Sequence, residues 1–225
     1  MDSSLGLFVL NTVLVPGAVL RLHVFEDRYK ALMTHCLERQ LPFGVLLDRN
    51  GLEVGDGLDP VEIGTTALIR QVTKLGAGRL YVIAVGERRF KVEKLIGMSP
   101  FWHASVSYID EPGDGRDAQV LRDLALERFR DYLQALLTGC GRELDALELP
   151  APPAASSWVI ADALQIEPAA KQRLLEARSA SDRLRAEIAL LEVETRRLRQ
   201  SRERKEQQSQ SAEAASFVAR FSRNY

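Results

Sequence analysis

The sequence has few cysteines and histidines and no long run of apolar residues. Its 225 residues include two cysteines, Cys36 and Cys140, and three histidines. Two cysteines do not make a disulfide framework, and no stretch of 18 apolar residues is present that could cross a membrane as a helix. No basic and then apolar leader precedes the first predicted strand. We therefore expect a cytoplasmic protein that does not enter a membrane.

Motifs for catalysis and for nucleotide binding are also missing. The sequence contains no G-x-x-x-x-G-K-[ST] phosphate loop, no G-x-S-x-G elbow and no H-E-x-x-H zinc motif. His23, His35 and His103 are far apart, and Gly55–Asp56–Gly57 lacks the spacing of a calcium loop. No pair of carboxylates is marked by its surroundings as a general acid and base. We expect no catalytic residue, no metal and no cofactor, and hence a protein that is not an enzyme.

The charge of the chain is nearly balanced. Lys and Arg together number 30 and Asp and Glu 31, which leaves a formal net charge of −1, so no overall field attracts nucleic acid. Cations gather in one segment only, at Arg196, Arg197, Arg199, Arg202, Arg204 and Lys205. Glutamates interrupt this basic cluster, and a solvated helix end explains it more simply than a nucleic-acid site.

Short strands separated by turns are predicted for the first half of the chain. The apolar run 7–10 is too short for a buried helix, and residues 19–25 alternate in polarity as a strand with one buried face does. Between them, Pro16–Gly17 is a turn signal. A helix is predicted from Asp27, since apolar residues then recur with helical spacing. Further strands are predicted at 43–47, 62–75, 79–85, 88–96 and 101–109. The last four are spaced as in an antiparallel meander or a small barrel.

Helices are predicted after the segment 111–115, where the composition changes. The first helix covers 120–137, and a proline-rich link follows at 149–155. The next helix is predicted to be capped by Ser156 or Ser157. The helix after it is predicted to hold Pro168 in its first turn.

The last helix is predicted to be the longest, from about Ser181. Leucines recur in it every seven residues, at Leu184, Leu191 and Leu198. A helix packed along a bundle and a coiled-coil dimer seam both produce this pattern. The bundle is favoured, because three repeats fall short of the heptads that a coiled coil needs.

Several of these segments together resemble the amino-terminal domain of Lon proteases, a domain also found as a free-standing protein. The matching segments are Leu7–Leu10, Val13–Gly17, Leu22, Phe25–Glu26, Arg28–Tyr29, Gly86–Val92, Lys171–Glu176 and Arg183–Leu184. Their order and spacing carry the resemblance, which covers roughly residues 5 to 200. The chain departs from the family at Val9 and Arg21, where proline is frequent, and at Val15, where phenylalanine is frequent.

The resemblance implies an α+β fold. A PUA-like β-barrel or pseudobarrel would span 1–115, a helical bundle that ends in a long helix would span 116–205, and a polar tail would span 206–225. In the family this domain engages protein substrates, with a preference for unfolded or degron-bearing chains. A free-standing member would bind such polypeptides, or act as an adaptor for a separate protease, without the ATPase and proteolytic modules. RNA binding is the alternative, because PUA-like barrels often serve RNA modification.

Two places are predicted to contact a peptide or protein partner. The first is the turn at Pro16 and Gly17. The second is the end of the chain, where Phe217, Phe221 and Tyr225 share one helical face and form either a short docking helix or a disordered tail. A homo-oligomer would form through the last helix or this tail. In the RNA-binding alternative, the basic cluster is the site.

Overall fold

A computed structural model gives the fold of most of the chain. It describes residues 4–51, 58–113, 115, 117–138, 141–142, 144 and 146–221, with side chains as far as residue 208. The Gly55–Asp56–Gly57 segment, Cys140 and Tyr225, each considered above, lie outside these residues.

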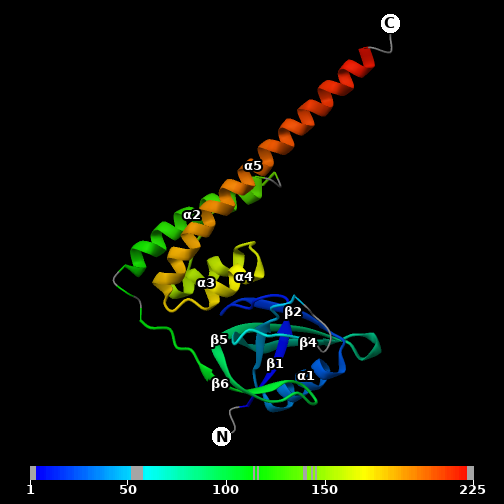
Figure 1. The fold of residues 1–225 in the computed structure, drawn as a ribbon, viewed down its shortest axis with the longest axis vertical. Helices are drawn as coiled ribbons and strands as arrows, with labels where there is room; N and C mark the ends of the chain where they lie inside the picture. The colour runs from blue at the N-terminus through cyan, green and yellow to red at the C-terminus, as the bar shows by residue number, and fades with distance from the viewer. Residues whose placement is uncertain are drawn as a thin grey trace.

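The first half of the chain forms a six-stranded sheet and one helix. The elements are β1 (Ser4–Leu10), β2 (Val19–Val24), α1 (Asp27–Arg39), β3 (Phe43–Leu47), β4 (Ile63–Lys74), β5 (Leu80–Gly97) and β6 (His103–Tyr108). The strand order is β2-β5-β4-β3-β1-β6, and β6 also pairs with β5, so five strands form a closed circuit with β2 outside it (Figure 1). A short 3-10 turn at Gly76–Gly78 joins β4 to β5. The predicted α+β class is confirmed.

The strand β5 corrects the prediction of two strands at 79–85 and 88–96. It is one strand of 18 residues, whose first half pairs with β2 and whose second half pairs with β6. Gly86, read as a break, lies within the strand and donates its N–H to the carbonyl of Ala18 at 2.9 Å. A Cβ at Gly86 would lie 2.4 Å from the carbonyl oxygen of Val15. This glycine therefore permits close packing of the β1–β2 loop rather than a turn.

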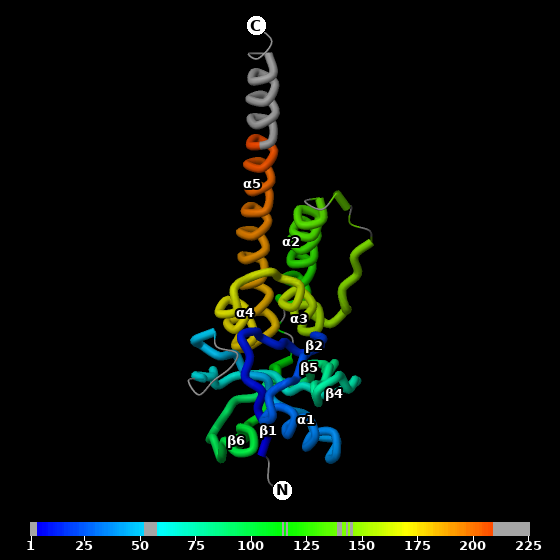
Figure 2. Tube along the Cα trace, turned by 90° about the vertical axis from the view of Figure 1, so that its right-hand side faces the viewer, coloured from blue at the N-terminus to red at the C-terminus, as the bar shows by residue number. Residues whose placement is uncertain are grey.

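Four helices form the second half of the chain. They are α2 (Ala118–Thr138), α3 (Pro153–Ala163), α4 (Pro168–Leu175) and α5 (Ala180–Phe221). α2 packs along α5, whereas α3 and α4 lie between this pair and the sheet (Figures 1 and 2). The start of α3 corrects the prediction of a cap at Ser156 or Ser157, because both serines are buried inside the helix and Pro153 occupies its first turn.

The position of α5 in the structure shows where its heptad leucines pack. Leu184 and Leu191 are fully buried in the core of this chain, and Leu198 packs against that core. The bundle interpretation of the heptad pattern is confirmed for these residues. α5 also runs without a break to Phe221, so it continues into the segment from 206 that is predicted as a polar tail.

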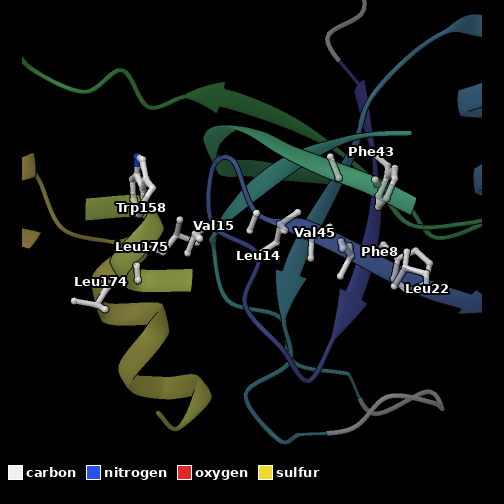
Figure 3. Close-up of a cluster of buried hydrophobic side chains, with 14 of the residues drawn as sticks. Phe8, Leu14, Val15, Leu22, Phe43, Val45, Trp158, Leu174 and Leu175 are labelled. Atoms are coloured by element: carbon white, nitrogen blue, oxygen red, sulfur yellow. The ribbon is translucent and has the colours of Figure 1, made fainter. Parts of the chain in front are cut away.

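The larger of two apolar cores runs through both halves of the molecule. Side chains from the sheet, such as Phe8 and Phe43, belong to the same buried cluster as Trp158 and Leu175 of α3 and α4. Figure 3 shows Leu175 beside Val15 of the β1–β2 loop at this junction. The bundle is thus packed onto the sheet, while a second buried cluster that includes Leu5, Leu46 and Phe90 lies within the sheet half.

Polar groups add directed contacts to this junction. Arg89 of β5 is buried and donates from Nη1 to the carbonyl oxygens of Leu175 and Ala177, at 2.9 and 2.6 Å. Carbonyls at the C-terminal end of a helix lack donors within the helix, so the guanidinium supplies hydrogen-bond donors to the end of α4. Gln172 of α4 donates to the carbonyl of Ile63 in β4 at 2.9 Å.

A second buried arginine holds the helices together. Arg183 of α5 has no exposed surface, lies 3.4 Å from the ring centre of Trp158 and pairs with Glu111 at 2.6 Å. Glu187, one turn further along α5, is also fully buried. Burial raises the pKa of Glu187 well above its ordinary value, and the nearby Arg183 guanidinium opposes this shift.

Replacing Arg89 should loosen the junction. In the Arg89→Ala variant two helix-end carbonyls lose their donor, and we expect the free energy of unfolding to fall by about 2–4 kcal/mol. The neighbouring Arg88 is the matched control, since its side chain is 56% exposed and contacts the exposed Asp110 and the exposed ring of Tyr108. Arg88→Ala should cost about 0.5 kcal/mol or less. Urea unfolding measures both, and equal losses would contradict the proposed role of Arg89.

Glu187 should make stability depend on pH in an unusual direction. A folded-state pKa above the unfolded value of about 4.3 means that the folded chain binds the proton more tightly. Glu187 therefore contributes most to the stability of the fold below about pH 4.3, its unfolded pKa. This contribution is lost as the pH rises through the folded-state pKa. The Glu187→Gln variant, which stays neutral, should gain stability relative to the parent chain as pH rises.

Urea unfolding between about pH 4 and pH 8 tests this expectation. Glu203→Gln, an exposed position on the same helix, is the control and should leave the pH dependence unchanged. A constant difference between Glu187→Gln and the parent chain across this range would contradict the assignment.

Candidate functional site

An apolar groove lies where the end of β1, the strand β2 and the start of α1 meet. We call it the β2 groove; its volume is about 310 Å³. It is lined by Phe8, Leu10, Asn11, Thr12, Leu20, Arg21, Leu22, His23, Phe25, Glu26 and Tyr29. All of these residues come from one short part of the chain, because the β1–β2–α1 connection folds back on itself.

The floor of the groove is aromatic and rigid. The rings of Phe8 and Tyr29 are stacked, with centroids 3.8 Å apart and an angle of 8° between their planes. The hydroxyl of Tyr29 donates to the carbonyl of Val9 at 3.2 Å, which fixes the start of α1 against β1. Burial raises the pKa of Tyr29, and the adjacent Arg28 cation opposes the shift. The phenol is therefore a neutral, apolar surface for a ligand.

The mouth of the groove combines one exposed aromatic with a polar rim. Phe25 is 56% exposed, a large fraction for a phenylalanine. Glu26 pairs with Arg28 at 2.8 Å, and that guanidinium lies 4.6 Å from the centre of the Tyr29 ring. His23 is exposed, as expected for the polar side of this strand. An apolar floor with a charged rim suits an apolar side chain carried by a polar chain.

The predicted turn residues do not line this groove. Gly17 has a positive φ of 83°, and its N–H bonds to the carbonyl of Gly86 at 2.8 Å. Pro16 and Gly17 therefore lie at the start of β2, next to the loop that packs on α4. The groove is lined from Leu20 onward, along the strand and past its other end.

The basic cluster lies on α5, and its six side chains are exposed. Arg196 and Arg199 line a wide groove between α2 and α5 that also holds Asp131 and Glu192. Elsewhere in the cluster, Arg197 lies 3.6 Å from Glu194 and Arg202 lies 2.7 Å from Glu206. Acidic partners thus alternate with the cations along this helix.

The terminal aromatic residues lie far from the sheet. Phe217 and Phe221 belong to the last turns of α5, which projects away from the rest of the molecule (Figure 1). Their side chains and Tyr225 are outside the described part of the chain. Of this predicted contact place, the structure describes the main chain of Phe217 and Phe221.

Sequence reasoning missed the aromatic residues of the groove as a site. One signal was available: with Leu20, Leu22 and Val24 directed inward, the next residue falls out of phase. Phe25 must then leave the buried face, and an apolar residue in that position marks a binding surface. The stacking of Phe8 on Tyr29 had no such signal, since it joins a strand to a helix 21 residues away.

Two other kinds of site find no support within the described residues. No group of three or more His, Cys, Asp or Glu side chains there could hold a metal ion. No described helix has the length and hydropathy needed to cross a membrane.

Comparison with known proteins shows which family the chain resembles. The profile described as "ATP-dependent protease La (LON) substrate-binding domain" matches residues 4–193. The Lon protease of Paraburkholderia phytofirmans is 32% identical over 182 residues, which are 78% of this chain and 22% of that protein. The Lon protease of Escherichia coli K12 is 29% identical over 186 residues, 82% of this chain and 24% of that protein. The chain thus spans less than a quarter of the length of these relatives.

Solved structures agree with the profile. The Lon N-terminal domain protein from Xanthomonas campestris superposes with a TM-score of 0.60 at 26% identity, covering 83% of this chain and 97% of that one. The N-terminal domain of the Mycobacterium avium complex Lon protease gives 0.61 at 19% identity, covering 84% and 98%, and supports the fold. With a family profile that covers residues 4–193 of the 225, the chain belongs to the Lon substrate-binding domain family.

Proposed function

We propose that this chain recognises unfolded or degron-bearing polypeptides and binds them through the β2 groove, without converting them chemically. The observation that carries the proposal is the apolar floor of Phe8 and Tyr29 beside the exposed Phe25. Unfolded and degron-bearing chains expose the apolar side chains that folded proteins bury, so an open apolar groove selects for them.

The family supports a role in substrate recognition. The name of the matching profile refers to substrate binding, and the curated relatives are called Lon proteases. The 225 residues contain no phosphate loop. We infer that these residues bind a client polypeptide. A separate protease then degrades the client, with this chain as its adaptor.

The groove is well placed for this role. Its lining residues do not include Val15, Ile63 or Arg89, which contact the helical bundle at the junction. A client can therefore occupy the groove without separating the bundle from the sheet.

Removing the exposed ring should weaken binding of an unfolded client. For Phe25→Ala we expect about a tenfold rise in Kd for fluorescently labelled casein, because the lost burial of a phenylalanine is worth about 1.5–3 kcal/mol. Fluorescence anisotropy measures this directly, and suppression of light scattering by an aggregating client gives an independent readout.

Tyr108 on β6 provides the matched control, since it is an aromatic residue that is 44% exposed and lies outside the groove. Tyr108→Ala should leave the Kd within about twofold. Unfolding midpoints of both variants should stay close to that of the parent chain, as is usual for surface positions. Absence of casein binding by the parent chain, or equal effects of both substitutions, would refute the proposal.

A further inference from the structure

Among the described residues, the strand β2 has one edge without a partner strand. It stands at the end of the strand order, and the strand that pairs with it there is β5. Gly86 of β5 donates to the carbonyl of Ala18, so the main-chain groups of Leu20 and Leu22, in the same phase, also face β5. In an antiparallel ladder the alternate residues turn their N–H and C=O groups the other way. The main-chain groups of Arg21 and His23 therefore point away from the sheet.

The β2 groove runs along this free edge. Four consecutive residues, Leu20 to His23, line it. Side chains of consecutive residues in a strand point to opposite faces, so a groove lined by all four must follow the backbone edge rather than either face. A ligand in the groove meets main-chain donors and acceptors as well as apolar side chains.

The opposite wall of the groove belongs to β1 and α1. In the described part of the chain, β1 pairs with β6 through Ser4–Gly6 and the N–H of Leu7 bonds to the carbonyl of Trp102, so it is the last residues of β1 that face the groove. The carbonyl of Val9 is already bonded to the Tyr29 hydroxyl at 3.2 Å. This wall offers the rings of Phe8 and Tyr29 rather than a second ladder, and Phe8 and Leu22 belong to the same buried cluster (Figure 3).

From this arrangement we infer that the groove takes one extended polypeptide segment, which adds to the edge of β2 as a further antiparallel or parallel strand. The inference rests on the proposed function and specifies how recognition occurs. The N–H and C=O groups of Val19, Arg21 and His23 form the ladder with the segment. Alternate side chains of the segment then enter the apolar wall, and the others remain in water.

The charge on the rim adds a preference among such segments. Arg21 is exposed and has no carboxylate within 4.0 Å in the described part of the chain, whereas Glu26 is neutralised by Arg28. The uncompensated charge beside the edge is thus positive. Segments with alternating apolar residues and a nearby acidic residue bind better than the same segments with lysine at that position.

A proline substitution tests the ladder separately from the apolar contacts. The N–H of Arg21 points off the edge, so Arg21→Pro keeps the pairing with β5 but removes a donor and blocks an added strand. The probe is a labelled heptapeptide of alternating valine and threonine with aspartate at each end. We expect Arg21→Pro to weaken its binding about tenfold or more, and Arg21→Ala to change it by only a few fold through the lost charge.

A second measurement does not depend on a variant that folds. On the parent chain, peptides carrying one backbone N-methyl group should lose binding when the methyl occupies alternate positions and keep it at the positions between. Hydrogen exchange at the amides of Arg21 and His23 should slow when the peptide is bound. A uniform response to N-methylation would overturn the inference.

The outcomes separate the inference from the proposed function. If Phe25→Ala weakens casein binding but Arg21→Pro and the N-methyl scan have no effect, the groove binds apolar side chains without strand addition, and the inference fails alone. The inference also fails alone if casein binds and the heptapeptide does not. If casein does not bind the parent chain, both fail.

Discussion

The fold depends on the contacts that join the sheet to the helical bundle. Apolar packing of Val15 against Leu175 brings the two halves together, but such contacts are not directional. The guanidinium of Arg89 adds direction, because it binds the two carbonyls at the end of α4 and so fixes where that helix stops on the sheet. A buried arginine without these acceptors would be costly, so the contact specifies one docking arrangement.

The same contacts between the sheet and the bundle leave the other side of the β-rich half uncovered. Because the bundle contacts Ile63 at the start of β4 and Arg89 in β5, it leaves the edge of β2 and the exposed Phe25 at the surface. Exposed edges and apolar patches favour aggregation, and proteins usually cover or charge them. Here Arg21 and His23 line the edge, which limits self-association and leaves room for a client chain.

Membership of the Lon substrate-binding domain family gives this groove its functional setting. The groove needs no metal, nucleotide or catalytic pair to hold an unfolded segment, only an apolar floor and main-chain partners. The charges of α5 fit this account, since the arginines of its basic cluster are interleaved with acidic partners such as Glu194 and Glu206. In the proposed function, this recognition module takes its specificity from the exposure of a chain rather than from one fixed sequence.

The sequence by itself determined the local structure and the family. Alternation in 19–25, helical spacing after Asp27 and the order of short motifs were enough, because these patterns reflect backbone periods that neighbours along the chain already define. Only the tertiary structure decided that β5 is one strand, that Arg89 ends α4, and that β2 is an edge with a groove beside it. Those features join residues 20 to 90 positions apart, and no periodicity along the chain records which distant segments meet.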